Sequence, residues 1–286
     1  MSDATWRLLD SGPADAHWNM AVDEAILACC GAGLAPPTLR FYRWEPPAVS
    51  LGYFQNAEKE LDLEECRRRG VGWVRRLTGG RAVLHDKEVT YSVVIPEELV
   101  PGGVLETYRL LCGGLERGLR LLGLEARPLR PRPEPFGAAG TGPRTRSAAC
   151  FDVPSWYELT VSGKKVVGSA QVRRAGAVLQ HGSVVLVLEP ERTASLLRLE
   201  PEARRRVAEG LGCAAAGVSG LLGREVGYAE VRDAVAQGFR EALGIALEAG
   251  GLSPEEEEMA TSLAKGGYSP DRGRGVAREG SRCSTL

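Results

Sequence analysis

The stretch WYELTVSGKKVVGSAQVRRAGAVLQHGSVVLVL, residues 156–188, carries the strand and turn pattern that decides the fold. Runs rich in β-branched residues are separated first by Ser162-Gly163 and then by Arg174-Ala175-Gly176. Short connections that contain glycine join neighbouring antiparallel strands. The stretch therefore predicts a three-stranded antiparallel meander.

Working outward from the meander, the chain mixes predicted strands and helices. Strands are expected at residues 39–44, 71–77 and 89–96, and helices at 18–30, at 108–122 and through most of 191–245. The helix at 18–30 is expected to carry Asp23 on its polar face. This order predicts an α+β fold, with mixed or antiparallel sheets flanked by helices.

The chain divides into one expected domain and a tail. Residues 1–250 are expected to form a catalytic domain. Inside it, residues 126–149 are too rich in Pro and Gly for a regular element and predict a lid-like loop. Residues 251–286 turn acidic and then rich in Gly and Arg, which predicts a flexible C-terminal tail.

The composition, with 43% hydrophobic residues and a net charge of −1, is typical of a soluble globular protein. The balanced charge argues against a nucleic-acid binder. No apolar run reaches the roughly 20 residues that cross a bilayer, and the first residues do not look like a signal peptide. We expect a cytoplasmic protein that binds neither nucleic acid nor membrane.

The metal-binding and nucleotide-binding motifs are missing from the sequence. Seven scattered cysteines include no C-x-x-C pair, and three histidines form no H-E-x-x-H motif. Neither G-x-x-x-x-G-K-[ST] nor G-x-G-x-x-G is found. No metal and no cofactor are expected.

One cysteine, Cys150, is placed differently from the others. The cysteines in predicted helices, expected to be small buried side chains, are Cys29, Cys66, Cys112 and Cys213. Cys150 instead ends the long loop, where we expect a substrate to reach it. A cysteine reacts as its thiolate, which a nearby ammonium group favours.

Lys164 and Lys165 open the middle strand of the meander and are candidate partners for the thiol of Cys150. Because side chains alternate along a strand, only one lysine can face the same groove as Cys150. Lys165 is expected to share the more polar face with Ser169 and Gln171, which makes it the better candidate. A cysteine with a lysine suits acyl transfer to an amine, whereas ordinary surface lysines of a hairpin are the alternative.

Several segments resemble the lipoate-protein ligase and octanoyltransferase superfamily, which shares its catalytic fold with biotin protein ligases. They are RRLTGGRAVLHD (75–86), GKKVVGSAQVRRAGAVLQHGSVVL (163–186), NMAVDEAIL (19–27) and LRFYRWEPPAVSLGYFQ (39–55). The resemblance covers about residues 5–245 and implies a biotin/lipoate protein ligase-like catalytic domain.

The branch of the superfamily is indicated by ACFDVPSWYEL (149–159), which resembles the LipM-type octanoyltransferases with their catalytic cysteine in this loop. Ligases typically carry a third glycine where this chain has Arg81. The other octanoyltransferase branch holds its cysteine where this chain has Leu179 and Gln180. The resemblance thus implies that Cys150 is the nucleophile.

The activity implied is ATP-independent octanoyl transfer from octanoyl-acyl carrier protein to a lysine of a lipoyl domain, such as that of the glycine cleavage H protein. Cys150 would carry the octanoyl group, and Lys165 would lower the pKa of its thiol and handle the proton of the incoming amine. Backbone N–H groups near Gly168 and Ser169 would hold the oxyanion.

The further substrate-binding residues that we expect are Arg75, Gly79, Gly80, His85 and His181. The Gly79-Gly80 turn and His85 would line or shape the acyl tunnel, and His181 would support the site. A structural hydrogen bond between His85 and Asp86 is the alternative for that histidine.

Three other functions stay open at this point. An amidotransferase would move octanoyl from the H protein to other lipoyl domains, and the position of Cys150 counts against it. An ATP-dependent lipoate ligase is disfavoured by Arg81. A non-catalytic acyl-binding module would need neither Cys150 nor Lys165.

Overall fold

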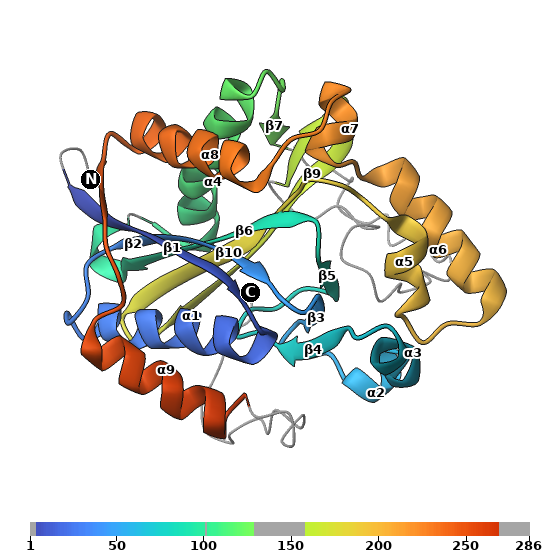
Figure 1. The fold of residues 1–286 in the computed structure, drawn as a ribbon. Coiled ribbons are helices and arrows are strands. Elements are labelled where there is room, and N and C mark those ends of the chain that lie inside the picture. The colour runs from blue at the N-terminus through green and yellow to red at the C-terminus, as the bar shows by residue number, and fades with distance from the viewer. Residues whose placement is uncertain (1–3, 101, 129–157, 269–286) are drawn as a thin grey trace, which may run out of the picture.

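The computed structural model describes residues 4–100, 102–128 and 158–268 (Figure 1). Its main element is an eight-stranded mixed sheet in the order β11-β1-β2-β6-β10-β9-β8-β7. The strands are β1 (Thr5–Ala14), β2 (Thr38–Trp44), β6 (Glu88–Pro96), β7 (Arg127–Pro128), β8 (Leu159–Val161), β9 (Lys164–Arg174), β10 (Ala177–Val185) and β11 (Ala246–Ala249). β1 pairs in parallel with β2 and β11, and the other neighbours are antiparallel. The predicted α+β class is confirmed.

The predicted meander is confirmed as β8, β9 and β10. Its first turn has φ angles of 51° at Ser162 and 78° at Gly163, the left-handed geometry that suits the twist of a two-residue hairpin. The second turn is one residue shorter than expected, because Arg174 still belongs to β9. Ala175 and Gly176 form that turn with φ angles of 54° and 81°.

Helices cover both faces of the sheet (Figure 1). α1 (Ala16–Gly31) and α9 (Pro254–Gly266) lie on one face, and α4 (Val104–Leu121) and α8 (Tyr228–Leu243) lie on the other. α4 and α8 approach closely, since a Cβ atom at Gly118 would lie 2.6 Å from Cα of Val235. Behind them, Tyr91 of β6 packs near Phe239 of α8, with ring centroids 6.5 Å apart.

A second, three-stranded sheet lies beside the first in the order β4-β3-β5. Its strands are β3 (Ala48–Leu51), β4 (Gly72–Arg75) and β5 (Val83–His85), and the helices beside it are α2 (Ala57–Glu60), α3 (Leu63–Arg68), α5 (Pro190–Ser195) and α6 (Pro201–Ala214). The remaining elements are η1 (Glu97–Leu99) and α7 (Val218–Leu222). Leu51, Leu196 and Leu211 share one apolar core there.

The prediction of a flexible tail is wrong for residues 254–266, because these residues form α9. Ser253 caps this helix, and its acidic first turn suits the positive end of the helix dipole. Glu256 is fully buried, and its carboxylate receives two hydrogen bonds of 2.6 Å from the guanidinium of Arg7. This partner lies on β1, so the sequence around residue 254 did not reveal it.

Two other expectations concern segments that are only partly described. Of the expected lid-like loop 126–149, residues 127–128 form the short strand β7 against β8. Residues 129–157, which include Cys150, lie outside the described residues, as do residues 269–286. Within the described part of the chain, no helix is both long and apolar enough to span a bilayer.

Candidate active site

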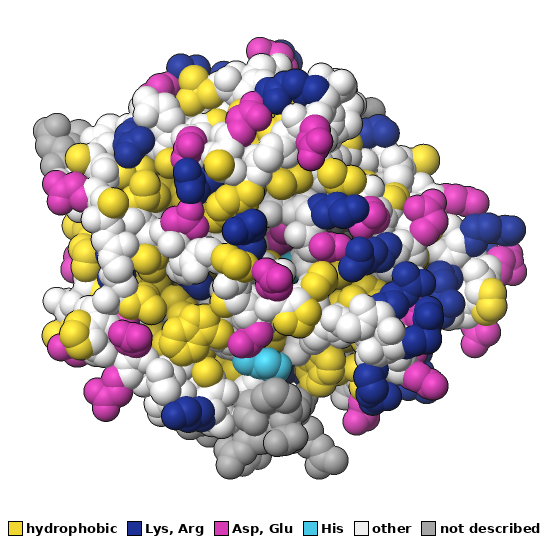
Figure 2. Space-filling view, viewed as in Figure 1, with side chains coloured by type: hydrophobic (Ala, Val, Ile, Leu, Met, Phe, Trp, Pro, Cys, Tyr) yellow, Lys and Arg dark blue, Asp and Glu magenta, His cyan; other side chains and the backbone are white. Residues whose placement is uncertain are grey.

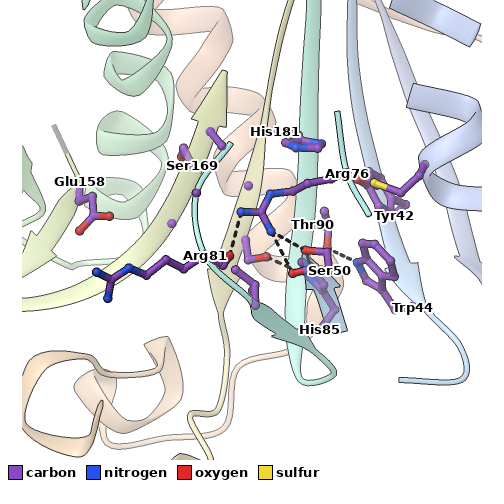
Figure 3. A pocket seen from close by; sticks show the side chains of 17 residues that line it. Tyr42, Trp44, Ser50, Arg76, Arg81, His85, Thr90, Glu158, Ser169 and His181 are labelled. Carbon is purple, nitrogen blue, oxygen red and sulfur yellow. Dashed lines mark hydrogen bonds between the residues drawn. The ribbon is translucent and has the colours of Figure 1, made fainter. Parts of the chain in front are cut away.

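A cavity of about 220 Å³ lies between the small sheet and the large sheet, and Figure 3 shows the side chains that line it. Its described lining residues are Met20, Tyr42, Trp44, Ser50, Arg76, Gly80, Arg81, Val83, His85, Thr90, Glu158, Gly168, Ser169, Ala170, His181, Gly182 and Ser183. Five of the predicted site residues are among them: Gly80, His85, Gly168, Ser169 and His181. The structure thus brings both recognised motifs to one hollow.

The glycine turn between β4 and β5 is held by Arg76, which the sequence analysis did not single out. Its Nη1 donates to the carbonyl and hydroxyl oxygens of Ser50, each at 3.0 Å. Its Nη2 donates to the carbonyl oxygens of Gly79 and Arg81, each at 2.8 Å. This buried guanidinium therefore shapes the turn from the inside, while Arg76 also lines the cavity.

The neighbouring Arg75, predicted to bind substrate, is not among the described residues that line the cavity. Its Nη1 donates to the carbonyl oxygens of Gly52, Tyr53 and Gln55. A Cβ atom at Gly52 would lie 2.0 Å from the carbonyl oxygen of Gly80, so the two loops are in close contact. Gly80 itself has a φ angle of 97°. Arg75 thus stabilises the loop that packs against the glycine turn.

His181 links the cavity wall to helix α1. Its Nε2 lies 2.7 Å from the hydroxyl of Thr78, and its Nδ1 lies 3.1 Å from Oδ2 of Asp23. Burial lowers the pKa of His181 below its usual value, so the imidazole is neutral at pH 7. Since a carboxylate only accepts, Nδ1–H donates to Asp23, and Nε2 accepts from Thr78. These contacts fix His181 in the cavity wall, and its supporting role stays a prediction.

Asp23 was expected on the polar face of its helix but is 1% exposed. Its carboxylate accepts from Nη1 of Arg40 at 2.6 Å, from Tyr42 at 2.9 Å and from Ser92 at 2.8 Å. Burial alone would raise the pKa of Asp23, but Arg40 and the hydrogen bonds from His181 and Ser92 hold it below its usual value. A charged pair therefore lies buried beneath the cavity.

His85 belongs to a polar cluster on another part of the cavity wall (Figure 3). Its Nδ1 lies 2.6 Å from Oε1 of Glu88, and its Nε2 lies 2.7 Å from the hydroxyl of Ser50. The ring stacks on Trp44 with centroids 4.1 Å apart. The alternative pairing with Asp86 is wrong, because Asp86 lies 2.7 Å from Nη1 of Arg192 instead.

Lys165, the proposed catalytic lysine, is buried at the start of β9. Its Nζ donates a hydrogen bond to Oε1 of Glu158, and the two side chains are 5% and 3% exposed. Glu158 lines the cavity, so the lysine connects with the cavity wall through this carboxylate. Lys164 is half-buried, and its Nζ donates to the carbonyl oxygen of Gly212 at 3.3 Å.

The argument from alternation that favoured Lys165 does not hold across the start of β9. Leu159 is opposite Val167, whereas Thr160 is opposite Lys165, so β9 contains one extra residue there. Val166 and Val167 both belong to the same apolar core. Such a bulge interrupts the alternation of side chains. Burial and a carboxylate partner, rather than a face shared with Ser169, are what distinguish Lys165 from Lys164.

Gly168 and Ser169 lie where β9 and β10 come closest to the cavity. A Cβ atom at Gly182 would lie 2.1 Å from the carbonyl oxygen of Gly168, so only glycine fits there. The hydroxyl of Ser169 lies 2.7 Å from the hydroxyl of Tyr91. The hydroxyl of Tyr108 donates to the carbonyl oxygen of Ser169 at 3.3 Å. These contacts fix the strand backbone at the cavity.

The described cysteines are, with one exception, inert buried thiols. Cys29, Cys66 and Cys112 are buried as predicted, and burial raises the pKa of Cys66 to about 11 and of Cys112 to about 12. Cys213 is exposed, so the prediction for it is wrong, because its side of α6 does not face the core. Among the described residues, no group of three or more His, Cys, Asp or Glu could hold a metal ion.

Comparison with known proteins places the chain in a family. The lipoyl protein ligase A/B catalytic domain matches residues 15–240. The octanoyltransferase LipM of Kyrpidia tusciae is 50% identical over 91% of this chain and 94% of its own length. The octanoyltransferase LipM of Bacillus subtilis is 43% identical over 95% of this chain and 98% of its own. The chain belongs to the LipM octanoyltransferase family.

Solved structures agree with this membership. The lipoate protein ligase of a bipartite archaeal system from Thermoplasma acidophilum superposes with a TM-score of 0.79 at 27% identity, covering 98% of this chain and 99% of its own. Lipoate-protein ligase A bound with ATP has a TM-score of 0.75 at 28% identity, covering 96% and 99%. The resemblance, the catalytic fold and the acyltransferase class that it implied are confirmed for this LipM-family chain.

Proposed function

We propose that this protein transfers an octanoyl group from octanoyl-acyl carrier protein to a lysine of a lipoyl domain, through a thioester on Cys150. The observation that carries the proposal is the near full-length identity to LipM octanoyltransferases. A cavity of matching size and the buried Lys165–Glu158 pair at its wall support it.

The cavity suits a medium-length acyl chain. An apolar cavity of roughly 150 Å³ is large enough for benzene, and this one measures about 220 Å³. Burying a CH₂ group is worth about 0.8 kcal/mol, so the seven carbons beyond an octanoyl carbonyl contribute on the order of 5 kcal/mol. Glu158 and Trp44 lie on opposite sides of the cavity in Figure 3, which suggests the reacting carbonyl near Glu158 and the chain toward Trp44.

The first step exchanges one thioester for another. The Cys150 thiolate attacks the carbonyl carbon of the octanoyl thioester, a C–S bond to the carrier breaks, and the carrier thiolate leaves. Because the bonds formed and broken are of the same kind, ATP is not needed. An unperturbed thiol with a pKa of about 8.5 is mostly protonated at pH 7, and the Lys165 ammonium would favour the thiolate.

The second step forms the amide. The acceptor lysine, with a reference pKa of about 10.4, must become a neutral amine before it attacks octanoyl-Cys150. The C–S bond then breaks, Cys150 leaves as a thiolate, and the attacking nitrogen gives up a proton that Lys165 would handle. Backbone N–H groups near Gly168 and Ser169 would stabilise the oxyanion.

Two features support acyl carrier protein as the donor in an ATP-independent reaction: the positive charge on one side of the molecule and Arg81 in the glycine turn. Lys and Arg side chains gather on the side of the molecule that carries α5 and α6 (Figure 2), which suits an acidic carrier protein. Arg81, whose side chain extends toward the Glu158 side of the cavity in Figure 3, replaces the third glycine of the ligases. This replacement disfavours adenylate chemistry.

The test is incubation with octanoyl-acyl carrier protein without ATP, followed by intact-mass spectrometry and peptide mapping. We expect an octanoyl group on Cys150, and Cys150→Ser should fold but lose turnover. An unmodified Cys150, or a label that requires ATP, would overturn the covalent mechanism. If octanoyl-H protein were the only productive donor, the amidotransferase function would replace the proposed one.

A further inference from the structure

A polar cluster at the end of the cavity near Trp44 aligns a hydroxyl, an imidazole and a carboxylate. The hydroxyl oxygen of Ser50 lies 2.7 Å from Nε2 of His85, and Nδ1 of His85 lies 2.6 Å from Oε1 of Glu88. Figure 3 shows Ser50 and His85 beside Trp44, on the side opposite Glu158. The three groups are connected in the same way as the nucleophile, base and acid of a Ser-His-Glu catalytic triad.

The direction of each hydrogen bond in this cluster follows from the donor at its end. A guanidinium can only donate, and Nη1 of Arg76 donates to the hydroxyl oxygen of Ser50 at 3.0 Å. The proton of Ser50 therefore points to its other neighbour, and Nε2 of His85 accepts it. Nδ1 of His85 then carries the ring proton and donates it to the carboxylate of Glu88. The serine hydroxyl thus already faces a basic nitrogen.

The imidazole and the carboxylate are also fixed from behind. Thr90 donates to Oε1 of Glu88, and the hydroxyl oxygen of Thr90 accepts from Nε1 of Trp44 at 2.8 Å. The ring of His85 stacks on Trp44 with an interplanar angle of 12°. His85 and Glu88 are each 5% exposed, and such dry surroundings strengthen hydrogen bonds. The base is therefore held in one orientation and one tautomer, as proton transfer from a hydroxyl requires.

A second histidine cluster has the same connections but does not offer its hydroxyl to the cavity. His181 contacts Thr78 through Nε2 and Asp23 through Nδ1. Thr78 is not among the described residues that line the cavity, whereas Ser50 is. Of these two hydroxyl groups, therefore, the Ser50 hydroxyl faces the space that a ligand can enter.

We propose that Ser50, His85 and Glu88 form a second catalytic site, which hydrolyses small carboxylic esters. The ester carbonyl lies at the Trp44 end of the cavity, where the proposed function places the far end of the octanoyl chain. The activity therefore goes beyond that function and does not rest on it. Since a cavity of roughly 150 Å³ holds benzene, one of about 220 Å³ holds about nine non-hydrogen atoms. This size is close to that of phenyl acetate.

The reaction consumes only the ester and water. Ser50 gives its proton to Nε2 of His85 while its oxygen bonds to the carbonyl carbon. The C–O bond to the leaving alcohol breaks, and the alcohol takes the proton from Nε2. Water then attacks the acyl-Ser50 carbonyl carbon and gives a proton to Nε2; the ester bond to Ser50 breaks, and the serine oxygen takes that proton as the carboxylic acid leaves. The Arg76 guanidinium stabilises the negative charge that develops at the reacting oxygen atoms.

The test uses phenylmethanesulfonyl fluoride, which sulfonylates activated serine hydroxyls and releases fluoride. The Cys150→Ala enzyme is used, so that ester turnover cannot come from that thiol. Intact mass and peptide mapping locate the label, and phenyl acetate hydrolysis is measured before and after labelling. We expect one label, on Ser50, and loss of hydrolysis once it is attached. A cluster with a purely structural role would give neither the label nor the hydrolysis.

Three further variants, made in the same Cys150→Ala enzyme, complete the test. Ser50→Ala should show neither label nor hydrolysis, and it should fold because Arg76 still donates to the backbone carbonyl oxygen of residue 50. His85→Gln should slow labelling on the order of 100-fold, the lower range for a lost general base. Ser262→Ala, at an exposed position of α9, is the control and should be labelled at the rate of its parent.

The outcomes separate this activity from the proposed function. An enzyme that takes no label on Ser50, or a Ser50→Ala enzyme that hydrolyses phenyl acetate as fast as its parent, would overturn the triad alone. Octanoyl transfer is measured separately on the wild-type enzyme. A wild-type enzyme that is labelled on Ser50 but takes no octanoyl group on Cys150 would support the triad and overturn the proposed function.

Discussion

Asp23→Asn is a substitution for which the structure predicts a large loss of stability. The change preserves the size of the side chain and removes its charge. In the wild type this carboxylate accepts hydrogen bonds from Arg40, Tyr42, Ser92 and His181. In the variant, the Arg40 guanidinium, whose side chain is 0% exposed, stays buried without a counter-charge.

The magnitude follows from the burial of that pair. Removing one partner of a buried ion pair typically costs about 3–5 kcal/mol. Native proteins are stable by only about 5–15 kcal/mol, so this loss is a large share of the total. At roughly 2–4 °C per kcal/mol for a chain of this size, the melting temperature should fall by about 6–20 °C.

The assay is denaturant unfolding at pH 7, with melting temperature as a second readout. Glu241→Gln is the matched control, because its partner Arg117 is 47% exposed and the pair lies on the surface. We expect no measurable change for that variant. A loss below about 1 kcal/mol for Asp23→Asn would refute the view that the Arg40–Asp23 pair is an essential buried contact.

The pH dependence gives a second check on Asp23. Because Arg40 and its other donors hold the pKa of Asp23 below the usual value, the stability that it contributes is complete above the unfolded pKa of about 3.9. That contribution is lost as pH falls through the lower folded pKa. The difference between wild type and Asp23→Asn should therefore be constant from pH 5 to 8 and should narrow only in acid below about pH 3.9.

Two further predictions concern the strands at the cavity. Lys165→Met should raise the pKa of the nucleophilic thiol and slow its alkylation by iodoacetamide at neutral pH, and much of the rate should return at high pH. Lys164→Met is the control and should change the alkylation rate little. Identical pH–rate curves for wild type and Lys165→Met would show that Lys165 does not activate the thiol. Gly182→Ala places a methyl carbon 2.1 Å from the carbonyl oxygen of Gly168, so urea unfolding should show a loss of about 1–3 kcal/mol and octanoyl transfer should fall. Gly210→Ala, with nothing within 4 Å of its Cβ position, is the control and should be tolerated.

The meander is the part of the fold that the sequence determined by itself. Its turns need residues that tolerate a positive φ, and Gly163 and Gly176 stand at the required positions. The flanking runs contain the β-branched residues that strands favour. All of this information is local, so residues 159–185 could be predicted without knowledge of any distant partner.

The tertiary structure decided which charged residues belong to the site. Asp23 and Glu158 are ordinary surface residue types in the sequence, yet both are buried because a cation from another element, Arg40 or Lys165, meets each of them. Among adjacent arginines, Arg76 rather than Arg75 lines the cavity.

The C-terminal segment shows the same dependence on a distant partner. Its acidic run, read alone, predicted a flexible tail, but Glu256 of α9 pairs with Arg7 of β1 across 249 positions of the chain. A local sequence pattern indicates secondary-structure propensity and hydrophobic periodicity. Whether a charged side chain is buried depends on a partner that only the folded chain brings near. The strands of the meander were therefore predictable, and the start of α9 was also marked locally by the capping box of Ser253 and Glu256. The buried acid–base pairs were not predictable.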